Sequence, residues 1–483
     1  MSRSMVRVGW LACILAVAGC ATNPVSGRRE LSLVSTAQED QIGREGYQAV
    51  LQEYGVYDDP RLQAYVDSVG QRLGRVSHLP NEHWKFTLLD DPTVNAFAMP
   101  GGYIYITRGI VAHLNSEAQL AGVLGHEIGH VTARHSAAQI TKQQIAGVGL
   151  GIAGLLSPGF AQYSQAAQTA LNLMFLKYSR ENETQADELG VEYSTAAGYD
   201  SREIPSTYAM LKRISEQSGQ RLPSFLATHP DPGNREERTR ALATRAVAGK
   251  TGLVVRQRGY VQSLDGIVFG RDPRHGYFEG THYYQPQMRF QMTFPEGWQT
   301  ADSKSAIRAA TSDQSAQMQV TLASDNGLSP AAYVSQLQAS GRILEARGRS
   351  ETIAGYPAWS GRLLLQDASG ARATLIAVFL RRSPDQMFQM LGKSPEVGDA
   401  AEDQIVRAAH SFRDLGDPAR LDVRPDRVKV IAAQRSGDFL SLVQSQGPQA
   451  AGIEETAILN NTFPDQPVNA GELFKIVVSG RGR

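Results

Sequence analysis

Two histidines and the glutamate that follows the first of them carry the clearest chemical signature in this sequence. They are His126, Glu127 and His130, in the order His-Glu-Ile-Gly-His. On a helix, residues four apart lie about one turn apart, so both imidazoles would leave the same face and could hold one zinc ion. Glu127 would lie beside the ion, where a carboxylate can take a proton from an attacking water and pass it to a leaving amine. The pattern therefore predicts zinc-assisted hydrolysis of a peptide bond.

The residues around this pattern favour a helix that begins near Ser116. Ser116 and Gln119 form an N-terminal capping pattern. Gly125 and Gly129 lower the helix propensity and suggest that another segment packs very close to this backbone. Apolar residues recur behind the cap at helical spacing, namely Leu120, Val123, Leu124, Ile128 and Val131. The alternative to a metal site is a helix with two structural histidines.

A third metal ligand must come from elsewhere in the chain. His135 lies nine residues after His126, which would put it on the opposite face of a continuous helix and exclude it as a ligand from that helix. Acidic residues are absent between positions 131 and 180. Farther on, Glu183 and Asp187 are four apart: Glu183 could bind the metal while Asp187 orients a ligand histidine. The alternative is the solvated face of an acidic helix.

This combination of motifs resembles the gluzincin metalloproteases, the family of HtpX, the CAAX-prenyl proteases, the mitochondrial Oma protease and the periplasmic BepA-type proteases. The resemblance extends from about Thr22 to Ala243. It includes Asn95-Ala96-Phe97-Ala98, Pro100-Gly101-Gly102, His229-Pro230 and Arg235.

The resemblance implies a complete set of site residues. His126, His130 and Glu183 would hold zinc, Glu127 would be the base, and Asp187 would contact a ligand. By the same resemblance, Asn95 would hold the backbone of the substrate; an ordinary turn asparagine is the alternative.

His229 lies in a proline-rich segment, residues 227–232. If this loop folds over the metal, neutral His229 could be a fourth ligand that keeps the enzyme latent; displaced, it could stabilise an oxyanion. The resemblance to BepA-type proteases supports such a switch. A structural histidine is the alternative.

The N-terminus reads as a lipoprotein signal. Arg3 and Arg7 precede an apolar run, and Val17-Ala18-Gly19-Cys20 closes it as a lipobox. Cleavage after residue 19 would leave Cys20 lipidated and the protein in the periplasm, anchored to a membrane. Alanine rather than aspartate after Cys20 favours the inner leaflet of the outer membrane, by resemblance to bacterial sorting rules. An ordinary signal peptide with a coincidental cysteine is the alternative.

The composition indicates a folded exported protein. The chain has 483 residues, 42% of them hydrophobic and 20% charged, and its formal net charge is zero, which argues against nucleic acid as a partner. We expect an α+β fold with a mainly helical zinc protease domain at residues 20–250. Two helices would span 35–54 and 60–76. A small sheet would contain strands at 86–89 and 103–106, the second being an edge strand that can pair with an extended substrate.

The rest of the chain divides into three predicted parts. Residues 251–285 would be a β-hairpin extension or linker, and 286–416 an antiparallel α/β domain that resembles PsbP and Mog1. Residues 417–483 follow a β-α-α-β order that resembles a LysM module, which would bind peptidoglycan; an adaptor without glycan affinity is the alternative. Within the protease domain, the apolar, glycine-rich segment 140–176 is either a buried helix pair or a flap that covers the cleft or touches lipid or unfolded substrate.

These features predict a zinc endopeptidase that is lipid-anchored in the periplasm and degrades unfolded or misassembled envelope and outer-membrane proteins. Outer-membrane assembly machinery and peptidoglycan are further candidate partners. The competing class is a chaperone-like assembly factor for outer-membrane proteins, with latent or vestigial catalysis. Retention of Glu127 beside a full ligand set argues against a dead enzyme.

Overall fold

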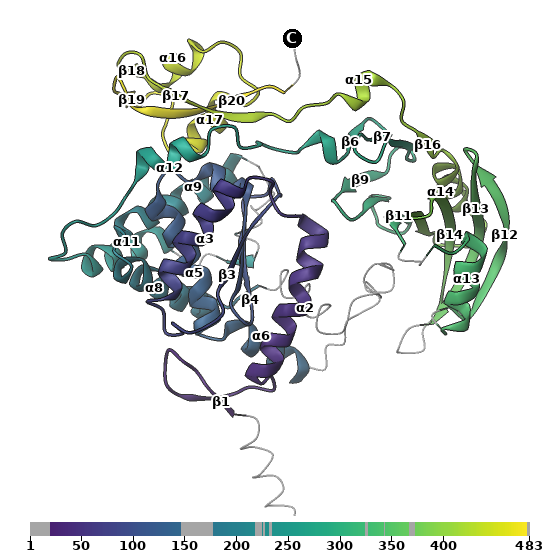
Figure 1. Ribbon diagram of the computed structural model, residues 1–483, viewed down its shortest axis with the longest axis horizontal. Coiled ribbons are helices and arrows are strands. Elements are labelled where there is room, and N and C mark those ends of the chain that lie inside the picture. The colour runs from purple at the N-terminus through teal and green to yellow at the C-terminus, as the bar shows by residue number, and fades with distance from the viewer. Residues whose placement is uncertain are drawn as a thin grey trace, which may run out of the picture.

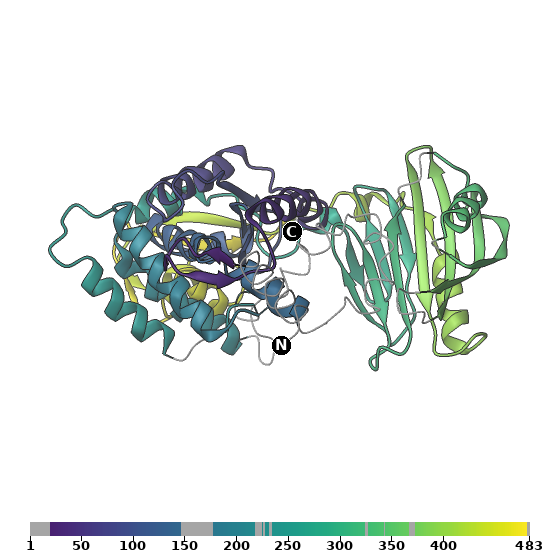
Figure 2. The same cartoon turned by 90° about the horizontal axis from the view of Figure 1, so that it is seen from below.

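The computed structural model describes residues 20–145, 177–217, 225, 228–230, 234–323, 327–341, 343–366 and 372–480. The predicted signal peptide and most of the predicted flap at 140–176 lie outside these residues. The described chain is α+β, as expected, and forms two bodies side by side (Figures 1 and 2). The helical body consists of the described residues of 20–269 with 427–478, and the sheet body of those of 277–414.

Helices form most of the helical body. Both helices predicted at its start are present, α2 (Thr36–Tyr54) behind the capping residue Ser35 and α3 (Pro60–Gly74) behind Asp59. The helix with the zinc motif, α5, spans Glu117–Thr132, and the Ser116 hydroxyl accepts from the Gln119 amide as the capping pattern predicts. The remaining helices are α4 (Arg108–His113), α6 (His135–Ile145), α8 (Arg180–Ala196), η3 (Ser201–Glu203), α9 (Ile204–Gln217), α11 (Arg235–Ala246) and α12 (Gln257–Ser263).

A three-stranded sheet packs against these helices in the order β3-β5-β4. β3 (Lys85–Leu89) runs parallel to β5 (Tyr103–Thr107), and β4 (Ala96–Met99) runs antiparallel to β5 on its other side. The prediction that the strand at 103–106 is an edge strand is therefore wrong. β5 is the central strand, and the two edge strands are β3 and β4. β4 lies inside the segment that was expected to be a connection. All four residues of β4, Ala96–Met99, are buried. A fully buried strand shows no alternation of apolar and polar residues, so the local pattern did not predict it.

The sheet body contains two sheets. The larger has seven strands in the order β12-β13-β14-β15-β11-β10-β9, and the smaller has four in the order β16-β8-β7-β6. Helices α14 (Ala400–His410) and α13 (Pro330–Ala339) pack on opposite faces of the larger sheet. The strands are β6 (Tyr277–Glu279), β7 (His282–Gln285), β8 (Phe290–Thr293), β9 (Gln299–Asp302), β10 (Ile307–Ala310), β11 (Gln317–Leu322), β12 (Glu345–Ile353), β13 (Tyr356–Gln366), β14 (Arg372–Ser383), β15 (Gln386–Lys393) and β16 (Arg413–Asp414).

Residues 251–285, predicted to be a β-hairpin extension or linker, contain one hairpin and two short helices. Helix α12 and the short helix η4 (Pro273–His275) precede the β6–β7 hairpin, which joins the sheet body. Tyr260 of α12 is fully buried, and its hydroxyl donates to the Val111 carbonyl over 2.8 Å. This tertiary contact explains why an alternating local pattern became a helix.

The C-terminal residues have the predicted β-α-α-β order and pack on the helical body (Figure 1). β17 (Arg427–Ala432) pairs with β20 (Leu473–Val478), with α16 (Phe439–Gln444) and α17 (Ile453–Leu459) between them. The short strands β18 (Gly437–Asp438) and β19 (Pro467–Val468) also pair, and α15 (Pro418–Leu421) precedes the unit. Ile458, Leu459 and Val477 belong to the main hydrophobic core of the helical body.

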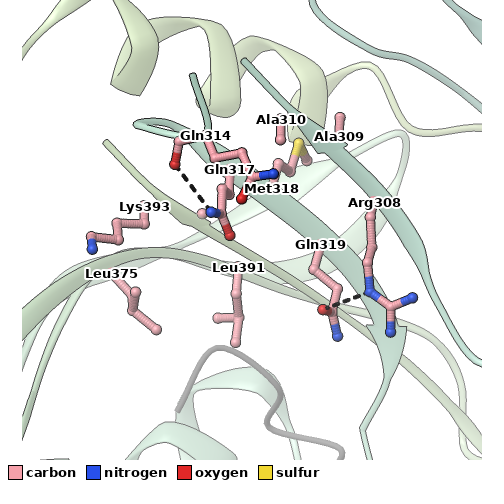
Figure 3. Close-up of a pocket in the computed structure, with 11 residues that line it drawn as sticks. Arg308, Ala309, Ala310, Gln314, Gln317, Met318, Gln319, Leu375, Leu391 and Lys393 are labelled. Carbon is pink, nitrogen blue, oxygen red and sulfur yellow. Dashed lines mark hydrogen bonds between the residues drawn. The ribbon is translucent and has the colours of Figure 1, made fainter. Parts of the chain in front are cut away.

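Polar contacts join the two bodies. The Lys304 ammonium lies 2.5 Å from the Asp90 carboxylate, and the Ser305 hydroxyl donates to Glu53. No helix in the described part of the chain has both the length and the apolar character needed to cross a bilayer. A hollow of about 170 Å³ lies on the larger sheet. Its charged lining residues are Arg308 and Lys393 (Figure 3).

Candidate metal centre

Helices α5 and α8 approach each other closely at their glycines. A Cβ atom added at Gly190 would lie 3.1 Å from the His126 backbone nitrogen, and one added at Gly125 would lie 3.1 Å from the Gly190 carbonyl oxygen. The capping box of Ser179 and Asn182 starts α8 so that its first two turns face the zinc motif. The close packing expected from the glycines of α5 is therefore present, and it brings Glu183 and Asp187 to His126.

Four side chains converge at this point, namely His126, His130, Glu183 and His229. The Nε2 atoms of His126 and His130 lie 3.0 Å apart, and the Glu183 carboxylate lies 3.4 Å from each of them. The Nδ1 atom of His229 lies 3.0 Å from Glu183 and 3.4 Å from the Nε2 atom of His126. All four residues are at most 2% exposed.

These separations fit a tetrahedral metal ion. Nitrogen and oxygen ligands lie about 2.0–2.2 Å from zinc, so the corners of the tetrahedron are roughly 3.3–3.6 Å apart. The observed spacings of 3.0 to 3.4 Å between donor atoms come close to that range. Three imidazoles and one carboxylate are also a donor set that zinc accepts. The arrangement can therefore hold a zinc-like ion, with His229 at the fourth corner.

Glu127 lies beside this cluster without a partner of its own. It is completely buried, and neither carboxylate oxygen has a hydrogen-bond partner among the described residues. The Nε2 atom of the His229 imidazole lies 3.8 Å from Glu127. Burial raises the pKa of Glu127, and His229 and His126 oppose part of that rise. A buried carboxylate with free lone pairs and a raised pKa is suited to move a proton.

Asp187 holds His126 from the side that faces away from Glu183. The Asp187 carboxylate is 3.0 Å from the Nδ1 atom of His126 and accepts from the Tyr208 hydroxyl over 2.7 Å. Burial raises the pKa of Asp187, but Arg235 and His126 outweigh burial and lower it to about 2. Burial likewise lowers the pKa of His126, but Asp187 and Glu183 raise it to about 9. An ionised Asp187 at this position can therefore orient the His126 ring.

Arg235 connects the two carboxylates from α11. Its guanidinium donates to Asp187 over 2.6 to 3.1 Å, and its Nη2 atom lies 3.2 Å from Glu183. It is 2% exposed and lies over the Tyr208 ring, 4.3 Å from the centroid. The resemblance included Arg235 in a motif without giving it a role. The structure shows that it compensates two buried negative charges.

His135 and Tyr178 also contact the cluster, and neither was predicted to do so. The chain leaves α5 through Arg134, whose φ of 55° ends the helix and turns the chain back. The Nδ1 atom of His135 therefore meets the Nδ1 atom of His130 at 2.9 Å, so the prediction that it lies on the opposite face of a continuous helix is wrong. The Tyr178 ring stacks on the His130 ring, with centroids 4.0 Å apart.

The segment with His229 is held against the sheet. The Phe225 ring stacks on the His229 ring at 4.4 Å, and the Phe225 amide donates to the Val94 carbonyl. Asn95 directly follows Val94 and therefore lies next to the point where the His229 segment is hydrogen-bonded. Its Oδ1 atom is buried without a hydrogen-bond partner among the described residues, so this oxygen can accept a further hydrogen bond.

The chain has relatives among metallopeptidases. Residues 60–245 match the model of Peptidase family M48. The chain is 31% identical over 222 residues to the mitochondrial metalloendopeptidase OMA1 of Schizosaccharomyces pombe, covering 44% of this chain and 63% of the relative. It is 31% identical over 202 residues to OMA1 of Arabidopsis thaliana, covering 42% and 40%. It is 30% identical over 224 residues to the beta-barrel assembly-enhancing protease of Escherichia coli, covering 44% and 45%.

These matches confirm the family resemblance that the motifs predicted, and the residues matched by the family model, 60–245, lie in the helical body. The chain spans only 40% to 63% of the length of these three relatives. Cyanobacterial PsbP from Synechocystis is similar to 28% of the chain and is itself covered to 94%, with 12% identity and a TM-score of 0.23. The PsbP-like and LysM-like assignments stay predictions.

Proposed function

Given that residues 60–245 match peptidase family M48, we propose that the protein is a zinc-dependent endopeptidase with His126, His130 and Glu183 as zinc ligands. The observation that carries this proposal is the placement of the unpaired, buried Glu127 carboxylate beside three donor groups at tetrahedral spacing. A purely structural cluster has no need of a second, unbonded carboxylate, because an unpaired buried charge is costly.

The residues of the chain divide the chemistry between them. Zinc, when bound, supplies Lewis acidity towards the scissile carbonyl and towards water. Glu127 takes the proton of the attacking water and gives it to the leaving amine, which its raised pKa favours. Asp187 accepts from the Nδ1 atom of His126 and keeps Nε2 directed at the cluster. Arg235 keeps Asp187 and Glu183 ionised and in place.

His229 is assigned the role of a latency switch. Its Nδ1 atom occupies the fourth corner, which a catalytic site must keep open for substrate and water. Three backbone hydrogen bonds of the described residues would have to break or move with this segment: the His229 amide to the Phe225 carbonyl over 2.8 Å, the Phe225 amide to the Val94 carbonyl over 3.2 Å, and the Tyr178 amide to the Thr228 carbonyl over 3.2 Å. Displacement of this segment would open the corner and leave the imidazole near Glu127, where it could stabilise an oxyanion.

Unfolded or misassembled envelope proteins are the proposed substrates. The names of the bacterial relatives, beta-barrel assembly-enhancing proteases, favour outer-membrane proteins and their assembly machinery as the setting. β4 replaces β5 as the edge strand to which an extended substrate can add. Asn95 precedes β4, and its free Oδ1 atom would accept from a substrate amide. Lipidation of Cys20 would anchor the protein in the periplasm, at the inner leaflet of the outer membrane, and the C-terminal unit would bind peptidoglycan.

The test is the cleavage rate of an unfolded fluorogenic protein by the chain from residue 20 onward. His229→Ala should raise the initial rate several-fold if His229 blocks the fourth corner. Glu127→Gln should abolish cleavage and still bind one zinc ion. A loss of zinc from Glu127→Gln would overturn the base assignment, and a fall in rate with His229→Ala would overturn the latency assignment. No cleavage by either the unchanged chain or His229→Ala, with zinc bound, would favour the assembly-factor function instead.

A further inference from the structure

We propose that the hairpin of β1 (Cys20–Thr22) and β2 (Arg29–Leu31), together with Leu33, lies on the surface of a phospholipid bilayer. We call these residues the leader hairpin. The inference rests on the proposed lipidation of Cys20 and goes beyond it, because it assigns a protein surface to the membrane and fixes which end of the helical body faces the lipid.

Two leucines of the leader hairpin are largely exposed. Leu31 is 57% exposed and Leu33 46%. Single exposed apolar residues are normal on protein surfaces. These two lie two positions apart, whereas the other exposed large apolar residues in the described chain are isolated, namely Val56, Val76, Leu322, Leu344, Val397 and Phe463.

The backbone register places these leucines beside the predicted lipid attachment. Cys20 pairs with Leu31 across the hairpin, and neighbouring strands lie about 4.8 Å apart. Acyl chains that enter the bilayer at Cys20 therefore bring Leu31 to the lipid surface. Arg28 and Arg29 are also exposed, and their guanidinium groups suit lipid phosphates. The Glu30 carboxylate between Arg29 and Leu31 accepts from the Asn23 amide. An apolar pair preceded by two arginines has the chemistry of a membrane-contacting surface.

The leader hairpin is fastened to the helical body rather than hanging from it. The Asn23 amide is 4% exposed and donates to the Ala133 carbonyl over 3.2 Å and to Glu30 over 3.0 Å. The Leu33 backbone amide donates to the Thr141 hydroxyl over 3.0 Å. These bonds attach the leader to the end of α5 and to α6. An anchor at Cys20 therefore orients the whole body, because at most about 10 Å of chain separates it from Asn23.

This attachment has a consequence for the metal centre. Ala133 caps the C-terminal end of α5 and lies three residues after His130. The membrane-facing end is therefore the end of α5 that carries the zinc motif. Figure 1 shows β1 at one end of the helical body and the β17–β20 unit at the other, so the C-terminal unit would face away from the lipid.

The first experiment measures vesicle binding by an unlipidated chain, residues 20–483 with Cys20→Ser. Vesicles of phosphatidylethanolamine and phosphatidylglycerol are sedimented, and the double variant Leu31→Ser, Leu33→Ser is compared with the matched double variant Leu344→Ser, Val397→Ser. We expect the leader variant to bind about tenfold more weakly and the matched variant to bind as the parent does. Equal binding by both variants, or no binding by the parent, would overturn the proposal.

The second experiment measures orientation in the lipidated chain. Since Cys20 is acylated and Cys13 is removed, a single introduced cysteine can carry a fluorophore. Lipid-attached quenchers should quench Leu33→Cys strongly and Leu344→Cys weakly, whereas equal quenching would overturn the proposal. Cleavage of a soluble unfolded protein should be unchanged in the Leu31→Ser, Leu33→Ser variant. If the protein cleaves its substrate but carries no lipid on Cys20, only the lipid anchoring in the proposed function is refuted. The first experiment uses unlipidated protein and would still test the leader hairpin.

Discussion

The Nδ1 atom of His135 lies 2.9 Å from the Nδ1 atom of His130, on the edge of the His130 ring opposite the nitrogen that faces Glu183. His135 in turn reaches Gln185 through its Nε2 atom, over 3.1 Å. The consistent tautomers are a His130 Nδ1–H that donates to His135 and a His135 Nε2–H that donates to the Gln185 oxygen. Burial lowers the pKa of His135 to about 4, which keeps its ring neutral and able to accept.

The contact between His135 and His130 predicts an effect on metal affinity. Replacing His135 with Ala removes the acceptor that orients the His130 ring, so zinc affinity should fall by about 10- to 100-fold. Competition with a chromogenic chelator would measure it. His410→Ala, a change to a partly buried histidine in the sheet body, is the control and should leave the affinity unchanged. Parent-like affinity in His135→Ala would refute the orienting role.

Removal of Arg235 should destabilise the metal-free protein. Arg235→Ala removes the positive charge that pairs with the buried carboxylates of Asp187 and Glu183. This should lower the free energy of unfolding by about 3–5 kcal/mol. Arg240→Ala on the same helix breaks an exposed pair with Glu236 and should cost less than about 1 kcal/mol. Urea unfolding with chelator present measures both. Equally small losses of unfolding free energy in the two variants would show that Arg238 or water compensates the charge of the carboxylates.

The approach of α5 to α8 makes Gly190 sensitive to a single methyl group. Gly190→Ala would press a Cβ atom against the His126 backbone and should cost about 1–3 kcal/mol, with weaker zinc binding, because Asp187 moves away from His126. Gly259→Ala in α12 meets open space and should be neutral or stabilise by up to about 1 kcal/mol. Thermal unfolding and chelator competition on both variants test the difference. Equal unfolding temperatures and equal zinc affinities in the two variants would mean that α5 and α8 can separate without a cost in free energy.

Lys475 predicts a pH dependence of stability. Its side-chain nitrogen is completely buried and donates to the Ala112 and Leu114 carbonyls over 2.8 and 2.9 Å. Burial holds the pKa of Lys475 well below its ordinary value, so the unfolded chain binds the extra proton. The stability contributed by Lys475 is therefore lost as pH falls and gained as pH rises towards the ordinary lysine value of about 10.4.

A variant that lacks Lys475 isolates this effect. The difference in midpoint temperature between the parent and Lys475→Met should grow in favour of the parent from pH 7 to pH 10. Lys393→Met removes an exposed lysine of the sheet body and serves as the control, for which we expect a constant difference. A constant difference for Lys475→Met as well would show that Lys475 has the same pKa in the folded and unfolded chain.

Patterns within one segment predicted much of the local structure. Ser116 and Gln119 located the start of the zinc-motif helix, and the apolar spacing located α2 and α3. The β-α-α-β order of the C-terminal unit was also visible. Capping and periodicity act over a few residues, so they can be read from a short stretch. The same local reasoning failed at Arg134, where a positive φ ended a helix that the pattern had continued.

The sequence by itself determined the donor types at the candidate site: a histidine pair one turn apart, a glutamate between them and an acidic pair on a later helix. Only the tertiary structure decided that His229, Arg235 and His135 meet these residues, that β4 rather than β5 is an edge strand, and that Lys475 enters the helical body. The reason is physical. Spacing along one helix follows from backbone geometry, whereas distances between segments follow from close packing and from the compensation of buried charge, which no short pattern encodes.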